Sequence, residues 1–201
     1  GLKERLALTK FVSQETLRTV EELKGTVGRS GVRRRVTVLF SDIRGFTSFS
    51  ETRQPEEVVE MLNHYLHTQA EVVVKHGGDI DKFVGDELMA RFIGDGAEVR
   101  ATRAAVEMIE AVAKLNAART DGGPSIQIGV GVNAGEVVLG AMGSEQRMDF
   151  TVIGDAVNLG ARLCSAAAKG EVLLSQYVRA AFEDLPGIAL VPLEPIKVKG
   201  K

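Results

Sequence analysis

The sequence has no tryptophan, a single cysteine and few other aromatic or proline residues. Its 201 residues include two tyrosines, eight phenylalanines and five prolines. The lone cysteine, Cys164, cannot form a disulfide within the chain, which excludes a small secreted domain held together by disulfides and favours a reducing compartment. The chain also lacks a signal peptide and any apolar run long enough to span a bilayer. We therefore expect a cytoplasmic domain, and whether a longer protein attaches it to a membrane stays open.

A strong net charge of either sign is absent as well. The chain has 25 lysine and arginine residues against 27 aspartate and glutamate residues, a formal net charge of −2. Nothing in this balance points to nucleic acid or to an anionic membrane surface as a partner. Any phosphate binding must therefore come from a local site. At 44% hydrophobic residues, the chain is long enough to bury one core.

The first 31 residues differ in pattern from the rest of the chain. Apolar residues recur there at roughly helical spacing among charges, and three glycines lie between Gly25 and Gly31, which suggests a hinge. Two interpretations stay open for this segment. It is either a solvated linker helix or a transmission element, which would connect an upstream sensor or form a dimeric coil.

The remaining pattern mixes helices with hairpins. We expect strands over 36–40, 79–84, 87–93, 126–133, 136–140 and 172–174, helices over 55–77, 97–115 and 154–168, and an extended segment over 188–199. Short turns at Gly85-Asp86 and Ala134-Gly135 predict two of the hairpins. Because hairpins make antiparallel sheets, we predict an α+β fold with a largely antiparallel sheet and helices packed on it.

Two acidic residues occur where predicted strands end. Asp42 follows the strand over 36–40, and Asp86 lies at the tip of the hairpin over 79–93. Each taken alone is typical of a turn or cap residue selected for its backbone geometry. Together they also match a carboxylate pair that binds two Mg²⁺ ions against a triphosphate, because Mg²⁺ takes one or two carboxylates plus substrate phosphates.

A third feature is the pair Asn158 and Arg162 in the helix predicted over 154–168. Residues four apart share one face of a helix, so an amide and a guanidinium project together. Such a pair suits a ribose and a phosphate. Taken alone it is equally an ordinary polar helix face.

Three segments, in this order, resemble the catalytic domains of class III adenylyl and guanylyl cyclases. They are FSDIRGFT at 40–47, DKFVGDELMARF at 81–92 and VIGDAVNLGARL at 152–163. The similarity extends from about Arg35 to Lys201. It implies the palm fold of that family, a ferredoxin-like βαββαβ core with extra strands and helices, in agreement with the α+β prediction.

The resemblance also implies a division of the chain. Residues 32–201 would form the cyclase catalytic domain, shortened at its C-terminal end, and residues 1–31 a linker or transmission helix. An upstream sensor or regulatory domain is expected in the longer protein.

The resemblance assigns two Mg²⁺ or Mn²⁺ ions to the carboxylates of Asp42 and Asp86. The backbone carbonyl of Ile43 would be a further metal ligand. Phe46 and Thr47, directly after the first strand, would face the substrate phosphates.

Lys82 and Thr151 match the residues that read the nucleobase in this family, with Lys82 bonded to the adenine ring. Many adenylyl cyclases have aspartate at the position of Thr151, and the bacterial class IIIb subgroup has serine or threonine there. Guanylyl cyclases tend to have glutamate at the position of Lys82 and cysteine at that of Thr151. The pair therefore favours ATP over GTP.

The remaining roles concern the ribose and the phosphates. Asn158 matches the residue that orients the ribose, and Arg162 the one that stabilises the α-phosphate in the transition state. Lys201 matches a lysine that contacts the terminal phosphates.

The resemblance thus predicts an adenylyl cyclase that converts ATP to 3′,5′-cyclic AMP and pyrophosphate in a homodimer. One chain would supply the metal ligands, and the other the groups that bind base, ribose and α-phosphate. Two alternatives remain. One is a guanylyl cyclase, disfavoured by Lys82 and Thr151. The other is a catalytically silent nucleotide-binding or dimerisation module, disfavoured because the metal and catalytic residues are all present.

Overall fold

The computed structural model describes residues 18, 21, 31–123 and 125–197. Almost all of the predicted linker or transmission helix, and Lys201, lie outside these residues. The elements that the structure describes from Val32 onward are, in chain order, β1 (Val32–Arg44), α3 (Phe46–Glu51), α4 (Pro55–Lys75), β2 (Asp79–Val84), β3 (Glu87–Phe92), α5 (Ala97–Ala118), β4 (Gln127–Ser144), β5 (Arg147–Ile153), α6 (Asp155–Ala166), β6 (Val172–Leu174) and α7 (Gln176–Arg179).

The strands form one six-stranded sheet. Its order is β2-β3-β1-β4-β5, and β6 pairs with the first part of β4. Only the β4–β6 pair among the described strands is parallel, and all the others are antiparallel. This arrangement confirms the predicted α+β class with a largely antiparallel sheet.

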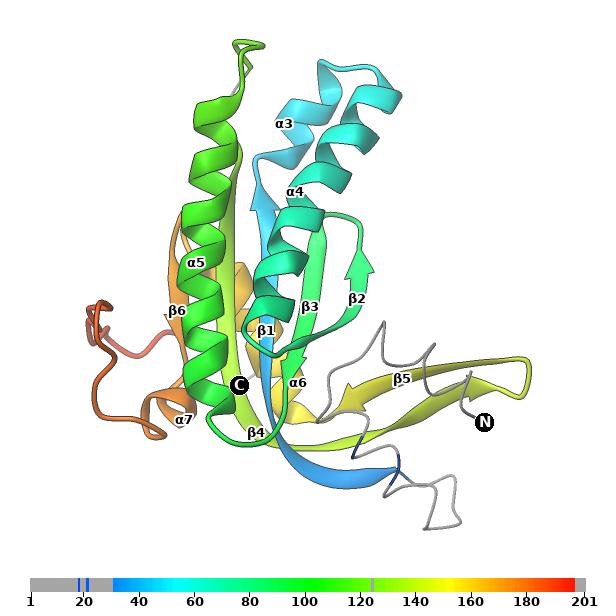
Figure 1. The fold of residues 1–201 in the computed structure, drawn as a ribbon, viewed down its shortest axis with the longest axis vertical. Coiled ribbons are helices and arrows are strands. Elements are labelled where there is room, and N and C mark those ends of the chain that lie inside the picture. The colour runs from blue at the N-terminus through cyan, green and yellow to red at the C-terminus, as the bar shows by residue number, and fades with distance from the viewer. Residues whose placement is uncertain (1–17, 19–20, 22–30, 124, 198–201) are drawn as a thin grey trace.

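Helices cover both faces of the sheet. Helices α4 and α5 pack together on one face, and α6 packs on the other against β1 and β4 (Figure 1). Strand β1 is therefore buried on both sides: Leu39 belongs to the core under α4 and α5, whereas Val38 and Phe40 belong to the core under α6. Because β1 is buried on both faces, its middle is mainly apolar and carries no charge, and its first carboxylate appears only near its end, at Asp42.

The two long helices begin and end largely as the sequence predicts. Helix α4 starts at Pro55 with a capping box between Gln54 and Glu57, so a side chain satisfies an amide that the first turn leaves unpaired. Most apolar residues of both helices are buried or half-buried, although Val59 and Val74 of α4 are exposed. Within the described residues, no helix combines the length and the apolar character needed to cross a membrane.

The hairpin predicted across Ala134-Gly135 is wrong. Both residues stay in register with β1, and neither has a positive φ, so β4 continues without a turn to Ser144. A Cβ atom at Gly135 would lie 2.9 Å from the Cβ atom of Ala156 in α6. The glycine therefore admits a closely packed helix and does not make a turn.

The second half of β4 pairs with β1 as far as Leu139 and with β5 from Val138 to Ser144, and no strand was predicted for β5. Helices α3 and α7 were also not anticipated. The segment predicted as extended forms no strand over residues 188–197, apart from an isolated bridge between Leu185 and Ile188.

Candidate active site

Acidic side chains gather where β1 ends beside the β2–β3 turn. Asp42 on β1 lies directly opposite Glu87 on β3. Asp86 sits in the turn itself, after Gly85, whose φ of 58° provides the left-handed backbone that the turn requires. The structure thus brings together the two predicted metal ligands and adds Glu87, to which the sequence analysis gave no role.

The electrostatics of this group favour a cation. Burial raises the pKa of Glu87, and the charges of Asp42 and Asp86 raise it further. Burial also raises the pKa of Asp42, an effect that Arg44 opposes and Asp86 reinforces. A divalent cation at this place would offset the repulsion among the three carboxylates.

The donor set fits a metal that arrives with a phosphate substrate. Oδ1 of Asp42 is buried and accepts no well-aligned hydrogen bond, although Nη1 of Arg44 lies 2.6 Å from it. Among the described residues, no three His, Cys, Asp or Glu side chains are grouped so as to hold a metal ion. Mg²⁺ needs only one or two carboxylates when phosphates and water complete its shell, so Asp42 and Asp86 meet its requirement.

The chain turns sharply after this acidic group. Gly45 has a φ of 75°, and α3 begins at the next residue, Phe46, with no side-chain cap at its first turn. Phe46 is half-buried and Thr47 is exposed. The amides of these two residues thus lie just beyond the carboxylates, where the sequence analysis expects phosphate contacts.

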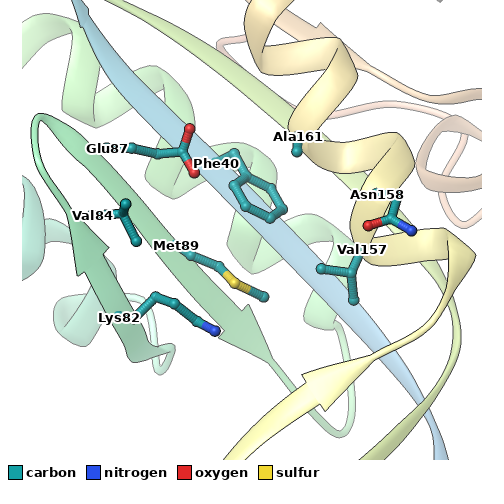
Figure 2. A pocket seen from close by; sticks show the side chains of 8 residues that line it. All are labelled: Phe40, Lys82, Val84, Glu87, Met89, Val157, Asn158 and Ala161. Atoms are coloured by element: carbon teal, nitrogen blue, oxygen red, sulfur yellow. The ribbon is translucent and has the colours of Figure 1, made fainter. Parts of the chain in front are cut away.

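A pocket of about 210 Å³ lies between the β2–β3 hairpin and α6 (Figure 2). Its lining residues are Phe40, Lys82, Val84, Glu87, Met89, Val157, Asn158 and Ala161. The apolar members suit the flat faces of a nucleobase, and Lys82 and Asn158 supply polar groups beside it. The volume is below the roughly 300–1,000 Å³ typical of pockets that enclose a drug-sized ligand.

The two predicted base-reading residues meet at a third residue, Asp81. The hydroxyl of Thr151 on β5 donates to Asp81, with Oγ1 at 2.9 Å from Oδ1 and 3.2 Å from Oδ2. Nζ of Lys82 lies 3.5 Å from Oδ1 of the same carboxylate. The sequence analysis missed Asp81, because ordinary strand alternation places neighbours such as Asp81 and Lys82 on opposite faces.

Helix α6 carries Asn158 and Arg162. Its start is held by Asn133, whose Nδ2 donates to the carbonyl of Ala156 at 2.7 Å. Asn158 lines the pocket from the side opposite Lys82 (Figure 2), whereas Arg162 is half-buried one turn further along and is not a lining residue.

The predicted site residues therefore fall into two groups within one chain. Lys82 and Asn158 line the pocket, and Thr151 is linked to Lys82 through Asp81, while Asp42 at the end of β1 and Asp86 in the β2–β3 turn stand outside the lining. Glu87 belongs to both, since it lines the pocket and its pKa responds to both aspartates.

Comparison with known proteins identifies the family. The model of the adenylate and guanylate cyclase catalytic domain matches residues 30–201. The chain belongs to this family. It is 41% identical to an adenylate cyclase of Anabaena cylindrica over 165 residues, which cover 80% of this chain and 32% of the relative.

Solved structures of cyclase domains have the same fold. The guanylyl cyclase Cya2 is 38% identical with a TM-score of 0.80, covering 86% of this chain and 89% of that one. The adenylyl cyclase CyaB from P. aeruginosa is 39% identical with a TM-score of 0.70, covering 74% and 80%. The palm-type cyclase fold expected from the sequence is thereby confirmed.

Membership of the cyclase family explains the chemistry assembled here. Cyclase domains of this family bind a nucleotide, use divalent metal ions and commonly function as dimers. This chain spans about a third of the length of the curated relative from Anabaena cylindrica.

Proposed function

We propose that this cyclase domain is an adenylyl cyclase, which converts ATP to 3′,5′-cyclic AMP and pyrophosphate. The observation that carries the proposal is that Lys82, a lining residue of the pocket, and Thr151 both contact Asp81, the first through an ion pair and the second through a hydrogen bond. An ammonium group can only donate, which suits the acceptor N1 of adenine and opposes the N1–H donor of guanine. The relative from Anabaena cylindrica is named an adenylate cyclase, which supports the same base.

The reaction is an intramolecular phosphoryl transfer. The ribose 3′-hydroxyl loses its proton to water, its oxygen forms a bond to the α-phosphorus, and the bond from that phosphorus to the bridging oxygen breaks, so pyrophosphate leaves with the electron pair. Two Mg²⁺ or Mn²⁺ ions held by Asp42, Asp86 and the carbonyl of Ile43 would supply Lewis acidity to the 3′-oxygen and the leaving group.

The other predicted residues bind and orient the substrate. Asn158 would orient the ribose, and Arg162 would meet the charge that builds on the α-phosphoryl oxygens. The amides of Phe46 and Thr47, and the side chain of Lys201, would contact the remaining phosphates.

Two copies of the chain would complete each site. The pocket is too small for a nucleoside triphosphate, and Asp42 and Asp86 do not line it. Large apolar side chains are also exposed, among them Val84 at 60% in the pocket lining and Met142 at 46% on the β4–β5 arm, which projects from the domain (Figure 1). Exposed apolar surface of this kind marks an interaction site, so we infer a homodimer in which each pocket faces the carboxylates of the other copy.

Turnover of ATP and GTP, measured in parallel with Mg²⁺ and with Mn²⁺ over a range of protein concentrations, tests the proposal. We expect cyclic AMP to form far faster than cyclic GMP, with specific activity rising with protein concentration. Faster cyclic GMP formation would instead support a guanylyl cyclase, the activity named for the neighbour Cya2. Bound ATP without any product would indicate a silent nucleotide-binding module, with an upstream sensor or regulatory domain as its partner.

A further inference from the structure

Asp81 occupies an unusual place on β2. The register between β2 and β3 shifts between Ile80 and Lys82, so Asp81 is an extra residue that has no partner across the ladder. Such bulges redirect side chains. Here the redirected carboxylate is completely buried, on the same side as Lys82 and beneath Thr151.

A buried arginine holds the Asp81 carboxylate in this position. Nη1 of Arg91 lies 2.7 Å from Oδ2, and the arginine, which is only 2% exposed, also stacks over the ring of Phe150 at 5.2 Å. Because a buried cation needs its partner, the carboxylate cannot rotate away without leaving Arg91 unpaired. Asp81 therefore presents its oxygens to Thr151 in a set direction.

This contact determines whether the Thr151 hydroxyl can donate a hydrogen bond to a ligand or only accept one. A carboxylate only accepts hydrogen bonds, so the single proton of the hydroxyl must point toward Asp81. The hydroxyl then has only lone pairs left for any other group. The hydroxyl can therefore only accept from a further group, whereas Lys82, which lines the pocket, donates.

We propose that Asp81 is a positioning residue that determines base specificity, because it fixes the Thr151 hydroxyl as an acceptor. This inference rests on the proposed function, in which Lys82 and Thr151 face the base. An acceptor matches the exocyclic amino group at C6 of adenine and opposes the carbonyl oxygen at C6 of guanine. The selected substrate class is a purine nucleotide with an amino donor at C6.

The variant Asp81→Asn tests this directional role. Its amide oxygen would face Arg91, so its amide NH₂ would donate to Thr151 and free the hydroxyl proton to point toward the base. We expect the ratio of kcat/KM for ATP to that for GTP to fall by about 10- to 100-fold, as for the reversal of one hydrogen bond near a charged group. A purely structural defect would lower both activities and leave their ratio unchanged.

Two comparisons make the test specific. In a Thr151→Val background, which has no hydroxyl to orient, Asp81→Asn should leave the ratio unchanged. Asp149→Asn removes the same charge from an exposed position on β5, two residues before Thr151, and should also leave the ratio unchanged. A ratio that falls equally with and without the Thr151 hydroxyl would overturn the inference.

If Asp81→Asn does not fold because Arg91 loses its partner, the double variant Asp81→Ala/Arg91→Met removes both charges, frees the Thr151 hydroxyl proton and is assayed in the same way. A lowered ratio supports the inference, and an unchanged ratio overturns it. The wild-type protein is assayed first, so that failure of the proposed adenylyl cyclase function can be distinguished from failure of the role proposed for Asp81. A wild-type domain that prefers GTP, or makes no product, overturns the proposed function, whereas a wild-type ATP preference that survives Asp81→Asn overturns only the role of Asp81.

Discussion

At the scale of single residues, the ionisation of Glu87 lowers the stability of the folded protein. Burial raises the pKa of Glu87, and the neighbouring Asp42 and Asp86 raise it further. A carboxyl whose pKa is higher in the folded than in the unfolded protein favours folding when it is protonated. As the pH rises through the folded pKa, that contribution is lost, so the ionised Glu87 destabilises the neutral-pH protein.

We therefore expect Glu87→Gln to raise the Tm at pH 8 without bound metal. The gain should shrink as the pH falls and vanish below the unfolded-state value of about 4.5, as followed by thermal unfolding between pH 4 and pH 8. The exposed Glu60→Gln on α4 is the matched control and should have little effect at either pH. A lower Tm for Glu87→Gln at pH 8 would contradict this account of the acidic group.

At the scale of elements, glycines decide how close α6 lies to the sheet. A Cβ atom at Gly131 of β4 would lie 2.3 Å from the backbone nitrogen of Cys164 and 2.7 Å from the carbonyl oxygen of Gly160. Both are backbone atoms of α6, so no side-chain rotation relieves the contact. Such glycines are read in a sequence as turn signals, which is how Ala134-Gly135 came to be predicted as a turn.

Gly131→Ala should force α6 away from β4. We expect a loss of about 1–3 kcal/mol in unfolding free energy, as for overpacking elsewhere, and a lower kcat because Asn158 and Arg162 move with the helix. Chemical denaturation measures the first effect and the cyclase assay the second. Glu136→Ala, an exposed change on the same strand, should stay within about 0.5 kcal/mol, and equal stability of the two variants would refute the packing argument.

At the scale of the whole molecule, the proposed dimer predicts that two inactive variants restore activity when they are mixed. Arg162→Ala should lower turnover by about 100- to 1,000-fold, as for loss of a preorganised charge contact, and Asp86→Asn should abolish metal-dependent turnover. In a mixed dimer, one of the two sites would combine the intact Asp86 of one chain with the intact Arg162 of the other. An equimolar mixture should therefore recover about a quarter of wild-type activity, since half of the dimers are mixed and each has one intact site.

Cyclic AMP formation by the re-equilibrated mixture measures this recovery. Each variant alone at the same total concentration is the control. If the mixture is no more active than the sum of the two variants, the proposed assignment of residues to opposite chains is wrong.

The sequence alone was enough to predict several elements, the fold class and the family of this protein. Local periodicity and turn chemistry were enough for α4, α5, α6, the β2–β3 hairpin and the α+β class, because those signals lie within a few residues of one another. The three motifs were enough for the family, since each holds its functional residues in a short, contiguous pattern.

Tertiary structure alone decided the roles that depend on distant neighbours. The closeness of Gly131 and Gly135 to α6 and the contact of Asp81 with Thr151 all join residues far apart in the chain. Alternation along β2 would have separated Asp81 from Lys82, and only the register shift against β3 places them together. A bulge, a helix–sheet distance and the direction of a hydroxyl proton are set by packing across the sheet, and no local pattern encodes them.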